Sequence, residues 1–317
     1  MHFTKKYSIH KDYKLLPVKN FQFSKPSVFM VNSLIRCQRI PTYLKVRYLQ
    51  ENIFHSISSF DGTPLKIIQI CPKGKTEKKE KLPALLYFHG GAFSFTYTSS
   101  HLHFVNFYAH HAHCKVFLVD YRLAPAHLYP VGFNDCYASF LWLKNHAKQL
   151  GIDPDKIILM GDSAGGGIAA GLAQKALDKK VSGIAAQVLI YPAIDGSYQS
   201  QSAQKFDDTP VWTATSNKRM WDLYLRKHPN KKDLYGSPFH RSNLKGIPKT
   251  YIETAEYDPL RDEGIQYGER LEDAGIKVVS NHTIGTVHAF DYLLSSELCK
   301  ESLQKRVNFL IDTFKQS

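Results

Sequence analysis

Short, continuous apolar runs alternate along the chain with longer segments in which apolar residues recur at helical spacing. Such runs are typical of strands buried on both faces of a sheet, and they cover residues 82–89, 116–121, 156–160, 186–191 and 249–254, with a last strand expected at 276–281. Helical spacing covers residues 101–113, 132–149, 164–179, 262–274 and 297–314. This alternation predicts βαβ units, and therefore a mainly parallel sheet with right-handed crossovers.

The ends of this pattern differ from its middle. Two β-rich runs, 52–58 and 65–71, flank Asp61-Gly62, which predicts a hairpin that adds antiparallel strands at one edge of the sheet. The sheet would then contain about eight strands. Residues 1–45 are aromatic and basic, with an amphipathic pattern near 27–39 interrupted by prolines. They predict one or two short helices that must dock on the rest, because the segment has no core of its own.

The alternation also breaks between residues 195 and 245. This stretch is rich in Ser, Gln, Asp and aromatic residues, and it contains one expected helix at 216–226. We interpret it as an insertion over the carboxyl ends of the strands, where open α/β sheets bind their ligands.

The pentapeptide Gly161-Asp162-Ser163-Ala164-Gly165 joins an expected strand to the helical segment that follows it. Gly-x-Ser-x-Gly in this position is typical of a nucleophile elbow, a strained turn that lifts a serine off the end of a strand. Glycines at 161 and 165 fit such a turn because a Cβ at either place would clash. The amide of Ala164 opens the helix without an intrahelical partner and could hold a negative oxygen. The alternative is a strand-to-helix loop without chemistry.

Two later residues could complete a triad with Ser163 in the order serine, acid, histidine. Asp258 follows the strand expected at 249–254, and His288 follows the one expected at 276–281, so both would lie at the same sheet edge as Ser163. An imidazole can accept the serine proton, and a carboxylate on its other nitrogen fixes the tautomer. Other interpretations stay open: Asp258 as a turn residue, His288 as a surface histidine, and Asp262, Glu263 or Asp291 as rival acids.

A glycine pair follows the strand expected at 82–89, in His89-Gly90-Gly91-Ala92-Phe93. Glycines there let backbone N–H groups turn towards a developing oxyanion, and each such donor typically lowers the barrier by a few kcal/mol. This loop could therefore supply oxyanion donors beside the amide of Ala164. His89 is expected to support the loop by bonding its carbonyls, not to react. The alternative is an ordinary glycine-rich turn.

Composition narrows the class of protein. A length of 317 residues and 43% hydrophobic residues suit one large α/β domain. The net charge is +13, with dense basic patches at 73–81 and 227–232 that lack the interleaved aromatics of a nucleic-acid platform. Solvated loops are therefore the favoured interpretation of the charge, with attraction to anionic surfaces as the alternative.

The cysteines and the lengths of the apolar runs indicate the cellular compartment of the protein. Five scattered cysteines without a Cys-x-x-Cys pair argue against a disulfide framework, and they are Cys37, Cys71, Cys114, Cys136 and Cys299. No apolar run reaches 18 residues, and no apolar stretch follows the N-terminal lysines as in a signal peptide. The sequence thus predicts a cytoplasmic protein without a membrane span. The histidines between 101 and 113 could not all converge from one helix, so no metal site is expected.

Six motifs, taken together, resemble the hormone-sensitive-lipase-like branch of the α/β-hydrolases, which includes bacterial acetyl esterases. They occur in family order over residues 87–290: Y-F-H-G-G-A-F (87–93), D-Y-R-L-A-P (120–125), G-D-S-A-G-G (161–166), L-I-Y-P (189–192), A-E-Y-D-P-L-R-D-E-G (255–264) and G-T-V-H-A-F (285–290). The resemblance implies the triad Ser163, Asp258 and His288 and a single α/β-hydrolase domain over 1–317. It further implies oxyanion donors from Gly90, Gly91 and Ala92, together with Ala164. It also implies that residues 1–45 and 195–240 form a cap that shapes the substrate pockets.

Two positions depart from the family pattern. Ala92 stands where the family often has a third glycine, and Ala126 stands where it usually has a glutamate. Ala92 keeps its N–H but narrows the alcohol side of the site, and Ala126 removes a carboxylate near the oxyanion loop.

The sequence therefore predicts a serine carboxylesterase that hydrolyses small-molecule esters through an acyl-enzyme, without metal or organic cofactor, and the resemblance to the family implies short acyl groups. Nucleic acid is not an expected partner, and the oligomeric state is open, with a homodimer as one alternative. A lipase or amidase with the same triad, and a non-catalytic ligand-binding member of the fold, are the other functions that the sequence allows.

Overall fold

A computed structural model describes residues 6–49, 53–72, 81–228 and 233–316. The strands are β1 (Ile53–Ser58), β2 (Pro64–Ile70), β3 (Leu82–Phe88), β4 (Lys115–Asp120), β5 (Ile152–Asp162), β6 (Ile184–Ile190), β7 (Lys249–Tyr257) and β8 (Val278–Val287). The helices are α1 (Lys25–Leu49), α2 (Ser99–His111), α3 (Val131–Asn145), α4 (Ala147–Leu150), α5 (Ala164–Asp178), α6 (Gln201–Lys205), α7 (Ala214–Tyr224), α8 (Arg261–Asp273) and α9 (Glu297–Gln316), with two 3₁₀ turns, η1 (Pro238–His240) and η2 (Phe290–Tyr292).

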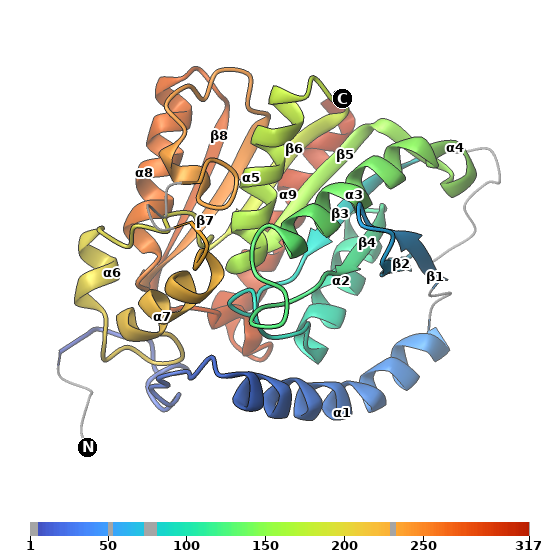
Figure 1. Cartoon of the computed structure of the whole chain (residues 1–317). Helices are drawn as coiled ribbons and strands as arrows, with labels where there is room; N and C mark the ends of the chain where they lie inside the picture. The colour runs from blue at the N-terminus through green and yellow to red at the C-terminus, as the bar shows by residue number, and fades with distance from the viewer. Residues whose placement is uncertain (1–5, 50–52, 73–80, 229–232, 317) are drawn as a thin grey trace.

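The eight strands form one sheet in the order β1-β2-β4-β3-β5-β6-β7-β8 (Figure 1). β1 and β2 pair in an antiparallel manner and β2 joins β4 in the same manner, whereas the other pairs are parallel. The predicted fold class, a mainly parallel sheet of about eight strands with a hairpin at one edge, is confirmed.

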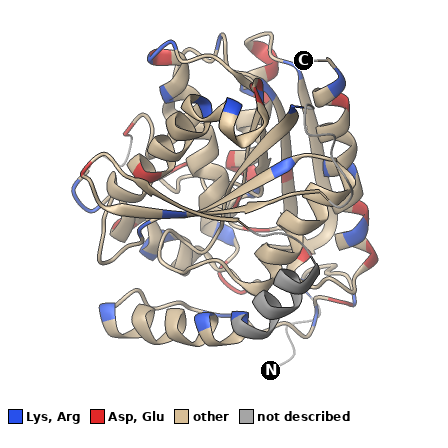
Figure 2. Cartoon of the chain, turned by 90° about the vertical axis from the view of Figure 1, so that its right-hand side faces the viewer, with Lys and Arg blue, Asp and Glu red and all other residues tan. Residues whose placement is uncertain are grey.

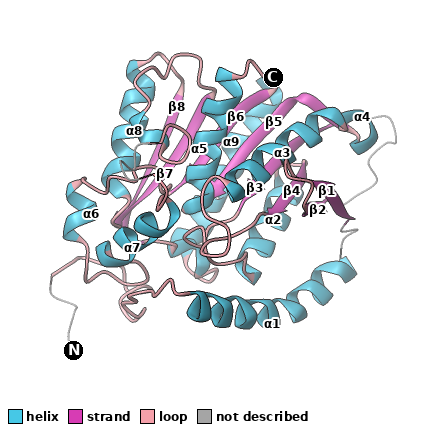
Figure 3. Ribbon diagram, in the orientation of Figure 1, coloured by secondary structure: helices cyan, strands magenta, loops and turns pink. Residues whose placement is uncertain are grey.

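Helices cover both faces of the sheet and give the molecule three layers (Figure 3). One core lies under α3, α5 and α8 and contains side chains such as Phe133, Leu172 and Leu271. The other lies under α2 and α9 and contains Tyr108 and Leu310. Alternate residues of each central strand point into the two cores, which is why these strands have almost wholly apolar sequences.

Several boundaries differ from the expectation, and three of the differences have a clear physical reason. β8 continues to Val287, because on this edge strand buried and exposed residues alternate after Val278 and give no continuous apolar run. The helix expected at 132–149 divides into α3 and α4 at His146. α1 is a single helix of 25 residues that passes through Pro41, not one or two short helices. A proline inside a helix removes one hydrogen bond and need not end it.

The basic stretches expected at 73–81 and 227–232 lie largely outside the described residues. Within the described ranges, no helix combines the length and the apolarity that crossing a bilayer requires.

Candidate active site

Ser163 occupies a sharp turn between the end of β5 and the start of α5. Its backbone angles are φ 53° and ψ −118°, a conformation that costs on the order of 1–3 kcal/mol for a residue with a side chain. A Cβ on Gly165 would lie 1.9 Å from the Phe88 carbonyl oxygen, and one on Gly161 would lie 2.3 Å from the Gly165 backbone. The steric reason predicted for these two glycines is confirmed.

The structure brings Ser163, His288 and Asp258 into one hydrogen-bonded row. The Ser163 Oγ lies 2.9 Å from His288 Nε2, and His288 Nδ1 lies 2.7 Å from Asp258 Oδ2. Asp258 is fully buried, whereas Ser163 and His288 keep 6% and 5% of their surface exposed. The row forms because β5, β7 and β8 run parallel, so that residues following their carboxyl ends meet at one sheet edge.

The rival acids are engaged elsewhere. Asp262 accepts from the Ser202 amide, and Glu263 accepts from the Ile194 amide. Asp291 pairs with Arg306 at 2.7 Å. Among these carboxylates, only Asp258 contacts the imidazole of His288.

The expected oxyanion donors divide into two groups. The Gly90 N–H donates to Asp162 Oδ1 at 3.0 Å, so the expectation that Gly90 donates to an oxyanion is wrong. Gly91 and Ala92 have φ of 116° and 55°, and neither amide donates to a backbone carbonyl within the described part of the chain. The Ala164 N–H belongs to the first turn of α5, where no carbonyl of the same helix can accept from it.

His89 has the structural contacts that the sequence suggested. Its Nδ1 lies 2.6 Å from the Gly90 carbonyl oxygen, and its ring stacks on Tyr121 with centroids 4.4 Å apart. Burial, with a smaller contribution from His101, lowers the pKa of His89 to about 3. The ring is therefore neutral at ordinary pH and unsuited to exchanging protons there.

The sequence analysis assigned no role to Asp162, yet its carboxylate contacts three separate segments. It accepts from the Gly90 amide, from the Tyr87 hydroxyl at 2.8 Å and from the Tyr292 hydroxyl at 3.1 Å, and it lies 3.2 Å from His101 Nε2. Burial opposes its ionisation, but the contacts with His101, Tyr87 and Gly90 outweigh burial and hold the pKa of Asp162 well below its usual range. The carboxylate thus connects the glycine loop that carries the candidate oxyanion donors, and the loop after His288, to the turn at Ser163.

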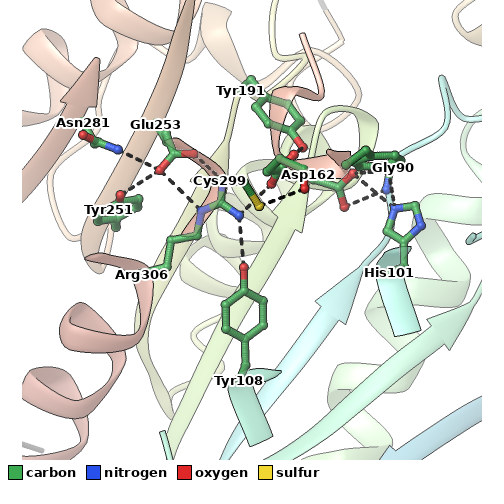
Figure 4. A network of polar contacts seen from close by, with 12 residues as sticks. Gly90, His101, Tyr108, Asp162, Tyr191, Tyr251, Glu253, Asn281, Cys299 and Arg306 are labelled. Atoms are coloured by element: carbon green, nitrogen blue, oxygen red, sulfur yellow. Dashed lines mark hydrogen bonds and ion pairs between the residues drawn. The ribbon is translucent and has the colours of Figure 1, made fainter. Parts of the chain in front are cut away.

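A second buried network anchors the segment that follows His288 (Figure 4). The guanidinium of Arg306 on α9 pairs with Asp291 and with Glu253, and all three side chains are almost completely buried. Asp291 also accepts from the Tyr191 hydroxyl at 2.5 Å, and the Tyr191 ring meets the His288 ring edge-on at 4.9 Å. The local sequence of α9 does not identify Arg306 as part of a buried ion-pair network, because its partners come from other parts of the chain.

The segment before α1 and the 195–245 insertion meet beside this site. The amide of Val211 donates to the Pro17 carbonyl at 2.9 Å, and the Phe21 amide donates to Ser216 Oγ at 3.0 Å. Trp212 lies 5.8 Å from the His288 ring and 5.7 Å from Phe21. An aromatic wall from both segments therefore borders the imidazole.

Asn32 of α1 holds the loop that follows the glycine pair. Its side-chain Nδ2 donates to the Ser94 carbonyl at 3.0 Å, and its Oδ1 accepts from the Thr96 amide at 2.9 Å. Nearby, the Arg39 guanidinium lies 3.8 Å from the centre of the Tyr97 ring. These contacts make α1 part of the support of the candidate oxyanion loop. This role could not be predicted from the sequence, because Asn32 is a single polar residue in an amphipathic helix.

The histidines of the α2 region point in different directions. His101 is buried against Asp162, whereas His103, His110, His111 and His113 are exposed. Across the ranges that the structure describes, no group of three or more His, Cys, Asp or Glu side chains has the arrangement of a metal site.

Comparison with known proteins gives consistent matches. Residues 85–292 match a family model described as the α/β-hydrolase fold. The chain is 37% identical to the esterase LipI of Mycobacterium tuberculosis over 234 residues, which are 72% of this chain and 70% of LipI. It is 33% identical to an ethyl acetate hydrolase of Pseudomonas putida over 208 residues, 65% of each chain. Among solved structures, a bacterial heroin esterase superposes with a TM-score of 0.86 at 32% identity over 95% of both chains.

Proposed function

The chain belongs to the α/β-hydrolase fold family, in its hormone-sensitive-lipase-like branch, and is a carboxylic ester hydrolase; from this premise we propose that Ser163, His288 and Asp258 are its catalytic triad. The single observation that carries the assignment is the continuous row from Ser163 Oγ through His288 to Asp258, with contacts of 2.9 and 2.7 Å. A serine hydroxyl is a weak nucleophile near neutral pH, and this arrangement supplies the base that it needs.

In the acylation half of the reaction, Ser163 Oγ attacks the ester carbonyl while His288 Nε2 takes its proton. Asp258 accepts from His288 Nδ1–H, fixes the tautomer and stabilises the imidazolium. The imidazolium then protonates the departing alcohol as the carbonyl re-forms on the acyl-enzyme. Water repeats the sequence in the second half, and the carboxylic acid leaves. Each proton moves between groups of this chain, substrate and water, so the proposal includes no metal or organic cofactor.

We assign the oxyanion site to the amides of Gly91, Ala92 and Ala164. The first two belong to a loop with left-handed backbone angles, and the third lies at the positive end of the α5 dipole. Because these donors are fixed before the reaction begins, they stabilise the charge that develops on the carbonyl oxygen without a cost of reorganisation.

The expected substrates are small-molecule esters with short acyl groups, from acetyl to butyryl. The aromatic wall of Phe21, Phe95 and Trp212 near the imidazole supports a pocket of limited depth. The likeness to an ethyl acetate hydrolase points to the same acyl size. We propose that residues 1–45 and 195–240 form the cap of this pocket within a single domain, as the Val211–Pro17 contact supports.

The proposal places the enzyme in the cytoplasm, without a nucleic-acid partner. All five cysteines are free, including the exposed Cys37. Free thiols that are not paired with one another are typical of proteins kept in a reducing compartment.

The decisive experiment compares Ser163→Ala with Ser139→Ala on p-nitrophenyl acetate. Loss of the nucleophile should lower kcat by a factor of at least about 10⁴. Ser139 is a buried serine that bonds only within α3, so its variant should stay within a few-fold of wild type. A fluorophosphonate should label wild type and Ser139→Ala but not Ser163→Ala. Retained hydrolysis in Ser163→Ala would remove this residue from the mechanism, and rates that rise towards twelve-carbon acyl chains would favour a lipase.

A further inference from the structure

The positive charge of the chain is concentrated in its first 49 residues. They contain ten Lys and Arg and one Asp, a net charge of +9, whereas the whole chain carries +13. α1 contributes five of these cations and no acidic residue, and Figure 2 shows basic residues in blue and none in red along the coloured part of this helix. Such charge asymmetry is typical of segments that meet an anionic surface.

The same segment presents large apolar side chains to solvent. Leu15 is 94% exposed, Phe29 71%, Met30 59% and Leu34 56%. Leu15 projects from an anchored stretch, because Tyr13 is fully buried and its hydroxyl lies 2.8 Å from Ser296 Oγ. These side chains are therefore held outward by the fold.

α1 has two distinct faces. Val28, Asn32 and Arg39 are buried against the body of the protein, whereas Met30 and Leu34, one turn apart, lie on the opposite side of the helix. Figures 1 and 2 show α1 and the chain before it along the same side of the molecule. We call this side, with Leu15, Phe29, Met30 and Leu34, the α1 surface.

Exposed cations adjoin the α1 surface at Phe29 and at Leu15. Lys25 and Arg36 of α1 are exposed, and together with Phe29 they line a cavity of about 530 Å³ between the helix and residues 120–127, where Asp120 is the acidic residue. Lys11 and Lys14 are exposed and close to Leu15 in sequence. The α1 surface therefore has basic residues at its edge.

We propose that the α1 surface docks on the face of an anionic phospholipid bilayer. Met30, Leu34 and Leu15 enter the boundary between head groups and acyl chains, and the flanking lysines and arginines meet the lipid phosphates. An exposed apolar face beside clustered cations is the composition of helices that lie in the plane of a membrane interface. Docking of this kind needs no spanning helix.

The charges favour this occupant over the alternatives. In a dimer through the same surface, two segments of net charge +9 would face each other and repel. Single-stranded nucleic acid is bound through several aromatic side chains on which successive bases stack, whereas the α1 surface as defined has one aromatic residue, Phe29, beside Leu15, Met30 and Leu34. A bilayer with anionic lipid supplies both the apolar interior and the negative charge.

Docking would also place the candidate active site beside the bilayer. Asn32, on the inner face of α1, holds the loop that carries the candidate oxyanion donors. Esters that partition into the membrane would then lie close to the site. This consequence rests on the proposed function, whereas docking itself does not.

The test is flotation of the full chain with vesicles of phosphatidylcholine alone and with vesicles that also contain phosphatidylglycerol. We expect binding only to the anionic vesicles, with a loss as salt shortens the range of charge interactions. Lys25→Gln with Arg36→Gln should weaken binding about thirtyfold, from about 1 kcal/mol for each cation near an anionic surface. Met30→Ser with Leu34→Ser should weaken it roughly tenfold or more, because the inserted apolar area is lost.

Two controls match these variants. Phe60→Ser removes an apolar side chain that is 60% exposed in the β1–β2 turn, and Lys148→Gln removes an exposed cation from α4; neither should alter flotation. Circular dichroism and the thermal midpoint verify folding independently of activity. Equal binding to neutral vesicles, no binding to either kind, or insensitivity to both double variants overturns the proposal. So does sedimentation that shows a dimer abolished by Met30→Ser with Leu34→Ser, or tighter binding to an oligonucleotide than to anionic vesicles.

Discussion

The loop that carries His288 and the loop that carries the candidate oxyanion donors are held in opposite ways. The first is fixed from the core, where Asp291 pairs with Arg306 and Tyr292 bonds Asp162. The second is fixed at Gly90 by Asp162, and beyond the glycines it is held by the buried Phe93 and by two hydrogen bonds from Asn32 of α1. One part of the site therefore depends on buried charge, and the other depends partly on a helix at the surface.

This difference separates stability from activity. A buried charge that has lost its partner strongly destabilises the folded state, so damage to the network of the His288 loop should lower the stability of the protein. Damage to the α1 contacts should leave the sheet intact and displace backbone donors whose positions matter chiefly in the transition state. Changes in the first part of the candidate site should therefore lower mainly the stability, and changes in the second should lower mainly kcat.

Arg306→Met tests the core half and has the largest expected effect. It leaves Glu253 and Asp291 buried without their cation, which should lower the free energy of unfolding by about 3–5 kcal/mol. Urea unfolding followed by circular dichroism measures the change. The matched control is Lys300→Met on the same helix, whose pair with Glu297 is exposed and should be worth less than about 1 kcal/mol. Equal losses in the two variants would mean that buried charge does not hold the His288 loop.

Acid should destabilise the protein through His89, at the base of the candidate oxyanion loop. Its pKa is lowered from 6.5 to about 3 in the folded protein, so the unfolded chain binds a proton below pH 6.5 that the folded chain does not. Stability from this group is complete above pH 6.5 and declines as pH falls towards 3. By pH 4.5 the loss should be roughly 2–3 kcal/mol.

The measurement is urea unfolding of wild type and His89→Gln at several pH values from 8 to 4.5. The variant has its own baseline at pH 8, and the prediction concerns the slope below pH 6.5, which should be shallower than that of wild type. Parallel slopes would show that the ring is protonated in the folded protein and that the base of this loop is not sensitive to acid.

Local sterics made part of this site predictable from sequence. Gly161 and Gly165 flank a serine at a strand end, and the turn that they permit follows from the absence of a Cβ. Ser163, Asp258 and His288 were each expected directly after a strand. Because the sequence also predicted a parallel sheet, this was sufficient to place all three at the edge formed by the carboxyl ends of the strands.

The supports of the site could not be predicted, because each depends on a partner distant in sequence. In the sequence, Arg306 is only one polar position on an amphipathic helix. Its role becomes clear in the structure, where it pairs with Glu253 and Asp291. The glycine pair in the sequence does not reveal which backbone amides are free to bind an oxyanion. In the structure, the Gly90 amide is not free, because it donates to the carboxylate of Asp162. β8 was predicted too short because its solvent-facing residues interrupt the apolar run.

Asn32→Ala tests the peripheral half and has the smallest expected effect. Without the amide, the Ser94 carbonyl and the Thr96 amide lose their partner, and the candidate donors at Gly91 and Ala92 gain freedom. We expect kcat on p-nitrophenyl acetate to fall about tenfold with KM nearly unchanged, because the donors act on charge that exists only in the transition state. The free energy of unfolding should fall by about 1–2 kcal/mol, less than for Arg306→Met.

The matched control is Ser33→Ala. The Ser33 hydroxyl bonds only the Phe29 carbonyl within α1, so this variant should retain wild-type kcat. If Asn32→Ala raised KM and left kcat unchanged, α1 would act on substrate binding, and the contrast between the two loops would not hold.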